Sequence, residues 1–168
     1  EEIFTVDFFR KMQSSQYSFF FRPHPLLKIK NTKYLHDLKK EFPILVDESS
    51  ESLYSLNDAD VLISDFSGIS MEYIALTKKP VIFIKLPKKI VNPHYDLYGI
   101  EPMELRVRMM PPNIFLESID YNKIKSAINF LLDQDLSHTY KSIEKFLYSP
   151  SDTSTTRATQ IIESWFKL

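Results

Sequence analysis

Short apolar runs alternate along the first half of the chain with segments whose apolar residues are spaced like one face of a helix. The runs span residues 17–21, 44–46, 61–63 and 81–84. They are nearly continuous in apolar character, which is typical of parallel strands that helices cover on both faces. The pattern predicts an α/β fold with a parallel sheet and helices on both of its faces.

Helical stripes accompany these runs. A first pattern of Phe4, Phe8 and Met12 begins close to the start of the sequence. The next two stripes are Tyr34, Leu35, Leu38 and Phe42, and then Ile69, Tyr73 and Leu76. We expect Pro80 to end the last of them, because proline cannot continue a helix.

The second half of the chain is less regular. Prolines recur from residue 87 to residue 112 and predict a long functional loop before a possible last strand at 114–116. Asp120 has the position of an N-cap for a helix. The apolar stripe of that helix is Ile124, Ala127, Ile128, Leu131 and Leu132. A further helix is expected over 140–147, and a final one carries Ala158, Ile161, Ile162, Trp165 and Phe166 after the cap-rich residues 149–156.

The composition limits the classes of protein. The 168 residues, 43% of them hydrophobic, are enough for one core, so we expect a single domain over 1–168. Because a helical pattern is under way almost from Glu1, we expect a piece of a longer protein. The sequence has no apolar run long enough to span a bilayer and no signal-peptide pattern, so we expect a soluble chain.

The net charge and the lack of clustered metal-binding residues argue against further classes of function. The chain has no cysteine and its four histidines are far apart, so we expect neither a metal nor a cofactor. The net charge of −1 argues against nucleic acid as a partner. A basic stretch could face an anionic substrate or a membrane surface, although such lysines more often form a solvated rim. Its members are Lys78, Lys79, Lys85, Lys88 and Lys89.

Residues 59–73 carry the most specific chemistry, since they read as a strand, a tight turn and a helix. Gly68, one of only two glycines, lies at the turn, where glycine permits close approach of a ligand or an unusual backbone conformation. The amides near Gly68, Ile69 and Ser70, with the hydroxyls of Ser67 and Ser70, would form a diphosphate cradle at the helix start. Glu72 could accept two hydrogen bonds from a ribose diol.

A plainer interpretation of this segment stays open, in which Ser64, Asp65 and Ser67 only cap the helix and Glu72 faces solvent. A second motif favours the binding site. Arg22-Pro23-His24-Pro25 follows the first predicted strand and would emerge at the same carboxyl edge of the sheet, where open α/β sheets bind ligands. The alternative for His24 is a structural loop histidine that bonds to backbone.

Together these motifs resemble the CDP-glycerol glycerophosphotransferase family, the teichoic-acid primases and polymerases. The resemblance rests on Arg22-Pro23-His24-Pro25, on residues 59–68 (ADVLISDFSG) with Glu72, and on residues 78–83 (KKPVIF). The chain departs from the family pattern at Phe66, Gly68 and Glu72, where tyrosine, serine and aspartate are usual. Those departures leave the donor open between glycerol, ribitol and sugar derivatives.

The resemblance implies the C-terminal, donor-binding half of a GT-B architecture, which is a Rossmann-like domain with a parallel sheet. By resemblance Ser67, Gly68 and Ser70 hold the donor diphosphate, Glu72 holds the ribose, and His24 lies near the transferred group. The other donor-binding residues expected from these motifs are Arg22, Ser64, Asp65 and Ile69. Thr155, Thr156 and Arg157 match a phosphate-binding cap before the last helix of many members, although that cap is here one residue shorter and lacks its glycine.

The implied reaction transfers a glycerol-phosphate-like group from a CDP-linked donor to a polymer or lipid-linked acceptor, with CMP leaving. A missing N-terminal domain would supply the base, so this chain alone should bind nucleotide but turn over little. We expect a cytoplasmic protein, with peripheral contact at the inner face of the membrane. Two alternatives remain: a GT-B glycosyltransferase that uses a nucleotide-sugar for capsule synthesis, and a non-catalytic docking domain.

Overall fold

A computed structural model describes the following residues: 4–43, 46–48, 52–65, 67–85, 94, 97, 99, 103–136, 140, 141, 143 and 151–166. The chain falls into two compact units, each described here by itself. Unit 1 comprises Glu1–Ala59 with Ile119–Ser126, and unit 2 comprises Asp60–Ser118 with Ala127–Leu168. That the chain is a single domain stays a prediction.

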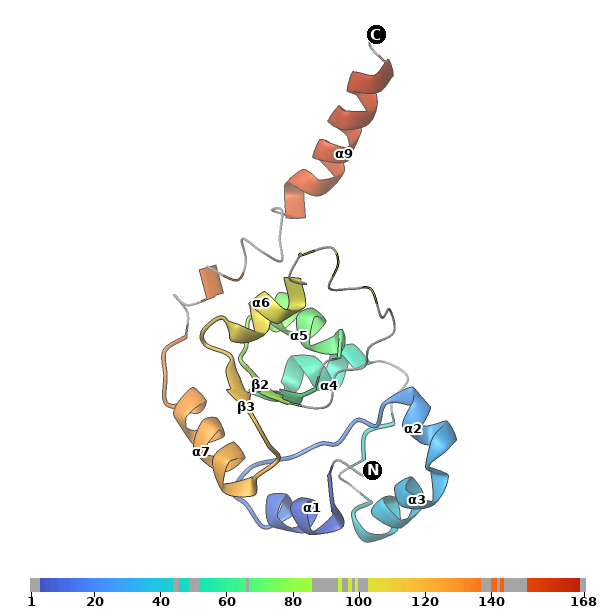
Figure 1. The fold of residues 1–168 in the computed structure, drawn as a ribbon, viewed down its shortest axis with the longest axis vertical. Coiled ribbons are helices and arrows are strands. Elements are labelled where there is room, and N and C mark those ends of the chain that lie inside the picture. The colour runs from blue at the N-terminus through green and yellow to red at the C-terminus, as the bar shows by residue number, and fades with distance from the viewer. Residues whose placement is uncertain are drawn as a thin grey trace. The chain divides into compact units, whose positions relative to one another are not determined.

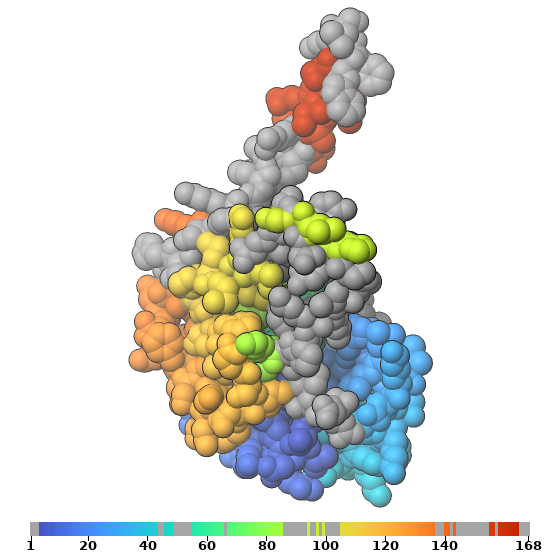
Figure 2. Space-filling model, in the orientation of Figure 1, coloured from blue at the N-terminus to red at the C-terminus, as the bar shows by residue number. Residues whose placement is uncertain are grey.

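Unit 1 is built mainly from short helices (Figure 1). They are α1 (Val6–Gln13), α2 (Pro25–Lys30), α3 (Thr32–Glu41) and α4 (Ser52–Asp58). Side-chain caps fix where α1 and α3 begin: Thr5 accepts a hydrogen bond from the Phe8 amide at 3.2 Å, and Asn31 accepts one from the Tyr34 amide at 3.3 Å. Helices α2 and α3 pack together and form a continuous surface in the space-filling view (Figure 2). The helices predicted from the first two stripes are confirmed.

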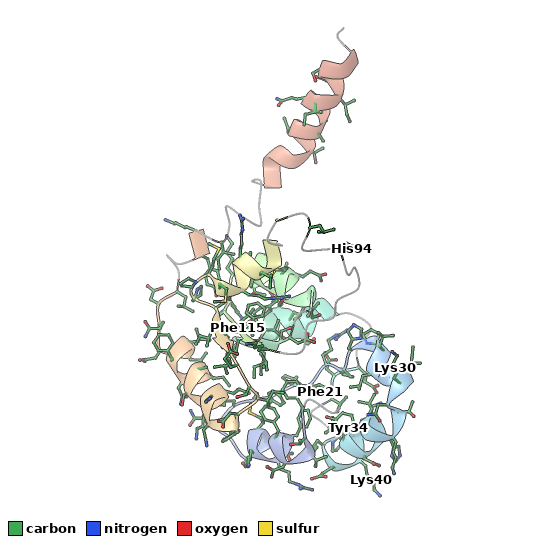
Figure 3. The ribbon with its side chains drawn as sticks, viewed as in Figure 1. Phe21, Lys30, Tyr34, Lys40, His94 and Phe115 are labelled. Atoms are coloured by element: carbon green, nitrogen blue, oxygen red, sulfur yellow. The ribbon has the colours of Figure 1, made fainter. Side chains whose placement is uncertain are left out.

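Aromatic side chains form the core of unit 1. Phe9 is fully buried, and its ring centroid lies 5.0 Å from that of Phe21 and 6.2 Å from that of Phe42. The Tyr34 hydroxyl donates to the Phe4 carbonyl at 2.6 Å, which satisfies its polar end inside the core. Figure 3 marks Phe21 and Tyr34 among the side chains of this unit.

The first predicted strand is reduced to a single parallel bridge, between Phe21 and Val46. The expectation of a strand buried on both faces is wrong here, because Phe20 is 60% exposed. The ring of Phe19 instead packs against α1, so side-chain contacts rather than a ladder of backbone hydrogen bonds hold the segment. Residues 44 and 45 of the second run lie outside the described residues.

Unit 2 contains a parallel sheet of three strands in the order β1 (Leu62–Ser64), β2 (Val81–Ile84) and β3 (Ile114–Leu116). In the register of this sheet, Ser64 pairs with Phe83 and Phe83 pairs with Phe115. Every residue of the central strand β2 is buried, as the continuous apolar run predicts, whereas β1 at the edge is largely half-buried. The predicted α/β class with a Rossmann-like parallel sheet is confirmed.

Helices α5 (Ile69–Thr77) and α6 (Met103–Met109) accompany this sheet (Figure 1). Helix α5 contacts β1, and helix α6 contacts β3. Asn113 fastens α6 to the sheet, because its side chain accepts from the Val81 amide at 3.1 Å and donates to the Val107 carbonyl at 2.8 Å. The prediction of a continuous loop through residues 87–112 is therefore wrong over α6. Most of the preceding part of that stretch lies outside the described residues.

The inner face of α5 differs by one position from the predicted stripe. Tyr73 and Ile74 are buried at 0% and 2% exposure, whereas Leu76 is 52% exposed. Burial also raises the pKa of the Tyr73 hydroxyl well above its ordinary value. The helix ends before Pro80, where Lys78 adopts the left-handed conformation and its amide donates to the Ile74 carbonyl at 3.0 Å.

Helix α7 (Tyr121–Leu132) confirms the predicted cap. The Asp120 carboxylate accepts a hydrogen bond from the Lys123 amide at 2.9 Å. The buried face is Ile124, Ala127, Ile128 and Leu131, as predicted, whereas Leu132 at the end of the helix is 51% exposed.

Two helices remain in the second half of unit 2. Of the helix predicted over 140–147, residues 140, 141 and 143 are helical and the others lie outside the described residues. Helix α9 spans Ser151–Phe166 and begins earlier than predicted. Its Ile161 and Ile162 are 46% and 50% exposed.

Candidate functional site

His24 is the N-cap of α2, and the hydrogen bond that it makes there determines which of its ring nitrogens carries the proton. The Nδ1 atom accepts a hydrogen bond from the Leu26 amide at 3.1 Å. A nitrogen that accepts cannot carry the proton, so the neutral ring is protonated at Nε2. The residue is exposed, and it can present the Nε2–H group to a ligand as a hydrogen-bond donor.

The prolines around His24 do not form the rigid loop that the sequence suggests. Pro23 is buried, whereas Pro25 is the first residue of α2. Proline is favoured at that position because its fixed φ suits a helix and its missing N–H would have no partner there. The rigid loop is therefore a helix start, and the alternative in which His24 bonds to backbone is correct for its Nδ1 atom.

Arg22 belongs to a group of polar side chains that the sequence analysis missed in part. Its Nη1 atom lies 2.8 Å from Oδ2 of Asp47 and 3.5 Å from Oγ of Ser55. Asp47 follows the apolar run that pairs with Phe21, just as Arg22 follows Phe21 itself. The signal was present in the sequence, because residues directly after neighbouring parallel strands meet at one edge.

In unit 2, the turn between β1 and α5 carries most of the predicted donor-binding residues. Ser64, the last residue of β1, is 9% exposed. Asp65 and Ser67 are half-buried and Gly68 is exposed. Gly68 is the N-cap of α5, and no side-chain hydrogen bond from the residues that the structure describes caps this helix. The interpretation of Ser64, Asp65 and Ser67 as helix caps is therefore wrong.

Gly68 does not need the conformational freedom of glycine. Its φ and ψ of −59° and −27° are open to any residue. A Cβ atom placed on Gly68 would meet nothing within 4 Å. The structure therefore does not show an unusual backbone conformation at Gly68, but it does show open space beside the backbone, into which a ligand could approach.

The backbone amides at the start of α5 are partly used by the turn itself. The Ser70 amide donates to the Ser67 carbonyl at 3.3 Å, and the Met71 amide donates to the Gly68 carbonyl at 2.9 Å. Among the residues that the structure describes, none accepts from the amides of Gly68 and Ile69. These two N–H groups fit the predicted anion cradle.

Ser70 has a different environment from the one expected of a phosphate ligand. The residue is fully buried, and its hydroxyl donates to the Ser67 carbonyl at 2.6 Å. The hydroxyl of Ser70 thus holds the turn together. Its expected contact with the donor diphosphate stays a prediction.

Glu72 lies in the first turn of α5 and is exposed. Its amide donates to the Gly68 carbonyl at 3.3 Å, which fixes the start of its side chain relative to the turn. An exposed glutamate in the first turn of α5 matches both the predicted ribose contact and the alternative of a solvated helix residue.

The last group of predicted phosphate contacts lies inside a helix. Thr155, Thr156 and Arg157 were expected at the start of the final helix, but α9 begins at Ser151. Only the first four amides of a helix lack an intrahelical partner, so the amides of these three residues are not at a helix start. Thr155 and Thr156 are exposed, and the side chain of Arg157 lies outside the described part of the chain. Contact of these three side chains with a phosphate stays a prediction.

The predicted basic stretch is partly neutralised. Lys79 lies 3.5 Å from the Asp60 carboxylate, and Lys85 lies 2.5 Å from that of Glu117. Lys88 and Lys89 lie outside the described residues. These pairs support the solvated-rim interpretation for Lys79 and Lys85. Within the described parts of the chain, no helix is long and apolar enough to cross a membrane.

The structure thus brings the candidate residues together in two local groups. One is Arg22 with Asp47 and Ser55, close in sequence to the cap at His24, in unit 1. The other is the turn of residues 64–72 in unit 2. That both groups face one donor stays a prediction.

Comparison with known proteins identifies the class. The family described as CDP-Glycerol:Poly(glycerophosphate) glycerophosphotransferase matches residues 1–90, which is more than half of the 168 residues. The chain belongs to this family, and the family implies a transferase that uses CDP-glycerol. The match includes both local groups of candidate residues. Searches of curated proteins and of solved structures find no match.

Proposed function

We propose that this chain is the donor-binding part of an enzyme that transfers a polyol phosphate from a CDP-activated donor to a growing cell-surface polymer. The observation that carries the proposal is the family match, because it spans Arg22, His24 and the turn up to Glu72. The available amides of Gly68 and Ile69 support it, since a diphosphate needs such donors.

The proposed reaction is a displacement at phosphorus. An acceptor hydroxyl attacks the β-phosphorus of the donor, the bond from that phosphorus to the bridging oxygen breaks, and CMP leaves with the bridging oxygen. Such a reaction mainly requires positioning and neutralisation of charge. The Gly68 and Ile69 amides would bind the diphosphate, Glu72 the ribose diol, and Arg22 the charge of the leaving phosphate.

The tautomer of His24 suggests its role in this reaction. With Nδ1 occupied by the Leu26 amide, the Nε2–H group can only donate. His24 would therefore donate a hydrogen bond to the reacting phosphate oxygens rather than remove a proton from the acceptor. The base would come from a second Rossmann-like domain of a GT-B enzyme, located in the cytoplasm at the inner face of the membrane.

Two experiments test this proposal. Calorimetric titration of the chain with CDP should show binding, and the non-catalytic docking alternative requires that neither CMP nor UMP binds. The full-length enzyme should then release CMP from CDP-glycerol in the presence of a polymer acceptor. Release of UDP from a nucleotide-sugar, with no release of CMP, would favour the glycosyltransferase instead.

A further inference from the structure

Helix α2 exposes two aliphatic side chains on one of its faces. Leu26 is 51% exposed and Ile29 is 75% exposed. Residues three or four apart lie on the same face of a helix, so these two side chains adjoin on the surface. Lys30, labelled in Figure 3, follows Leu26 by four residues and belongs to the same face. None of the six residues of α2 is buried, which leaves this face outside the core of unit 1.

The chain through α2 and α3 carries an excess of positive charge. Residues 25–40 contain five lysines and a single acidic residue, Asp37, although the whole chain has a net charge of −1. This local excess creates a positive potential over the surface of the two helices, and such a potential attracts anionic partners.

Ion pairs use only part of this charge. Glu48 lies 3.9 Å from Lys28 and also pairs with Lys39. Lys30 at the end of α2 and Lys33 in the first turn of α3 are exposed, and neither forms an ion pair with a residue that the structure describes. We call the exposed residues Leu26, Ile29, Lys30 and Lys33 the α2 patch, and all four belong to unit 1.

The chemistry of the α2 patch matches the surface of a lipid bilayer. At that surface the phosphates of the headgroups lie beside the acyl chains, so a helix that enters shallowly meets anionic and apolar groups at once. The two aliphatic side chains can enter the boundary between headgroups and acyl chains, while the long stems of the two lysines let their charges reach the phosphates. Exposed apolar residues with a polar rim are typical of such contact sites.

The size of the α2 patch argues against a protein as its partner. A stable protein interface needs about 800 Å² and about 20 residues on each side. The patch offers two aliphatic side chains and lies mainly on a helix of six residues. A bilayer requires no large complementary surface, because its lipids are mobile and can gather around a small basic and apolar site.

We propose that the α2 patch is a contact surface for an anionic lipid bilayer, which its two aliphatic side chains enter and whose phosphates its two lysines bind. The contact is peripheral and reversible, because so few side chains contribute to it. The inference goes beyond the proposed function and does not depend on it. Where the proposed function also holds, the contact brings His24, at the start of α2, close to a lipid-linked acceptor.

The experiment is co-sedimentation of the chain with lipid vesicles in a buffer of low salt. One set of vesicles contains equal parts of phosphatidylglycerol and phosphatidylcholine, and the other contains phosphatidylcholine alone. We expect binding to the anionic vesicles that weakens as salt is added, because salt screens the attraction of the lysines. Binding to the neutral vesicles should be much weaker.

Variants of the α2 patch test each kind of contact. Lys30→Gln should lower the partition coefficient for anionic vesicles by about 5-fold, the effect of one lysine near a charged bilayer. Ile29→Ser should lower it by about 3- to 10-fold, since the side chain enters the bilayer only in part. Leu26→Ser should act in the same direction. All three side chains are exposed, so the variants should fold normally, which circular dichroism checks.

Matched variants on α7 control for general effects of charge and hydrophobicity. Lys125→Gln removes another exposed lysine of unit 1. Leu132→Ser removes a leucine that is 51% exposed, the same fraction as Leu26. Both controls should bind anionic vesicles almost as well as the unmodified chain.

Several results would overturn the inference. Absence of binding to anionic vesicles, or equal binding to both sets, would exclude the proposed contact. Unchanged binding by both Ile29→Ser and Lys30→Gln would place the lipid contact elsewhere, and equal losses in the α7 controls would show that no defined surface binds. Self-association in sedimentation velocity that Ile29→Ser abolishes, without vesicle binding, would assign the patch to a second copy of the chain. The vesicle experiment needs no nucleotide, so each of these results leaves the proposed function standing.

Discussion

The Nδ1 atom of His24 helps to start helix α2, because it accepts a hydrogen bond from the Leu26 amide. Replacement by alanine therefore has two effects at once, a lost cap and a lost Nε2–H donor. Replacement by asparagine separates them, because asparagine is among the best N-cap residues.

We predict that His24→Ala and His24→Asn both lower the turnover of the full-length enzyme by about 10²- to 10³-fold, with little change in donor affinity. Only His24→Ala should also destabilise the chain, by about 1 kcal/mol for the lost cap. Steady-state kinetics and urea unfolding measure the two effects. Normal turnover of His24→Asn would show that His24 serves only as a helix cap.

Glu72 is the residue for which two interpretations are still equally compatible with the structure. Its exposed side chain suits a ribose ligand and a solvated helix position alike. A change in nucleotide affinity distinguishes them, because a solvated carboxylate with no ligand contributes nothing to binding.

We predict that Glu72→Ala weakens CDP binding by about 1.5 to 3 kcal/mol, the range for hydrogen bonds to a charged group, and leaves the unfolding free energy nearly unchanged. Calorimetry with CDP measures the affinity. Glu163→Ala on α9 is the control, because Glu163 is another exposed helical glutamate. Equal affinity of Glu72→Ala and the unmodified chain would return Glu72 to the solvated interpretation.

At the scale of elements, the β1–α5 turn depends on Ser70. Its buried hydroxyl and its amide both donate to the Ser67 carbonyl, so one residue closes the turn through two hydrogen bonds. The sequence could not show this, because a serine one position inside a helix can face either the ligand or its own turn.

We predict that Ser70→Ala lowers the unfolding free energy by about 1 kcal/mol, the usual contribution of one intramolecular hydrogen bond. The Ser67 carbonyl keeps its bond from the Ser70 amide, so no larger loss is expected. The midpoint of urea unfolding measures the change, with the half-buried Ser67→Ala as the comparison. An unchanged midpoint together with weaker CDP binding would show that the hydroxyl turns toward the ligand.

Elements with a strong local signal could be predicted from the sequence. Helix α7 has both a capping aspartate and a regular apolar stripe, and β2 has a continuous apolar run, so local and tertiary preferences agree. Helix α2 was missed because its first residue is Pro25, which looked like part of a rigid loop. Helix α6 was missed because prolines flank it and because Asn113, which fastens it, bonds to a strand 32 residues away in the sequence.

At the scale of the whole molecule, the sequence could predict those parts of the candidate site that consist of residues close together in the chain. The turn at Gly68 and the motif at His24 are each local, so the sequence located both. The partner of Arg22 is Asp47, 25 residues further along, and such a pair depends on how segments meet in space. The family match to residues 1–90 includes all of these positions.

Binding of a nucleotide should stabilise the whole chain by mass action, because only the folded state holds the turn and its amides in place. We predict that CMP and CDP raise the melting temperature more than UDP or ADP at the same concentration. At 100 times the dissociation constant the stabilisation is about 2.7 kcal/mol. For a chain of this size that corresponds to a rise of roughly 5 to 11 °C.

Thermal scans of the chain with each nucleotide at matched concentrations measure these shifts. The Glu72→Ala variant is the matched control, since it should show a smaller shift with CDP and an unchanged melting temperature without ligand. Equal shifts with CDP, UDP and ADP would indicate that the amides of the turn bind any diphosphate and would contradict the cytidine donor. A larger shift with UDP than with CDP would assign the chain a nucleotide-sugar, because the base would then be read as uracil while the diphosphate contacts stay the same.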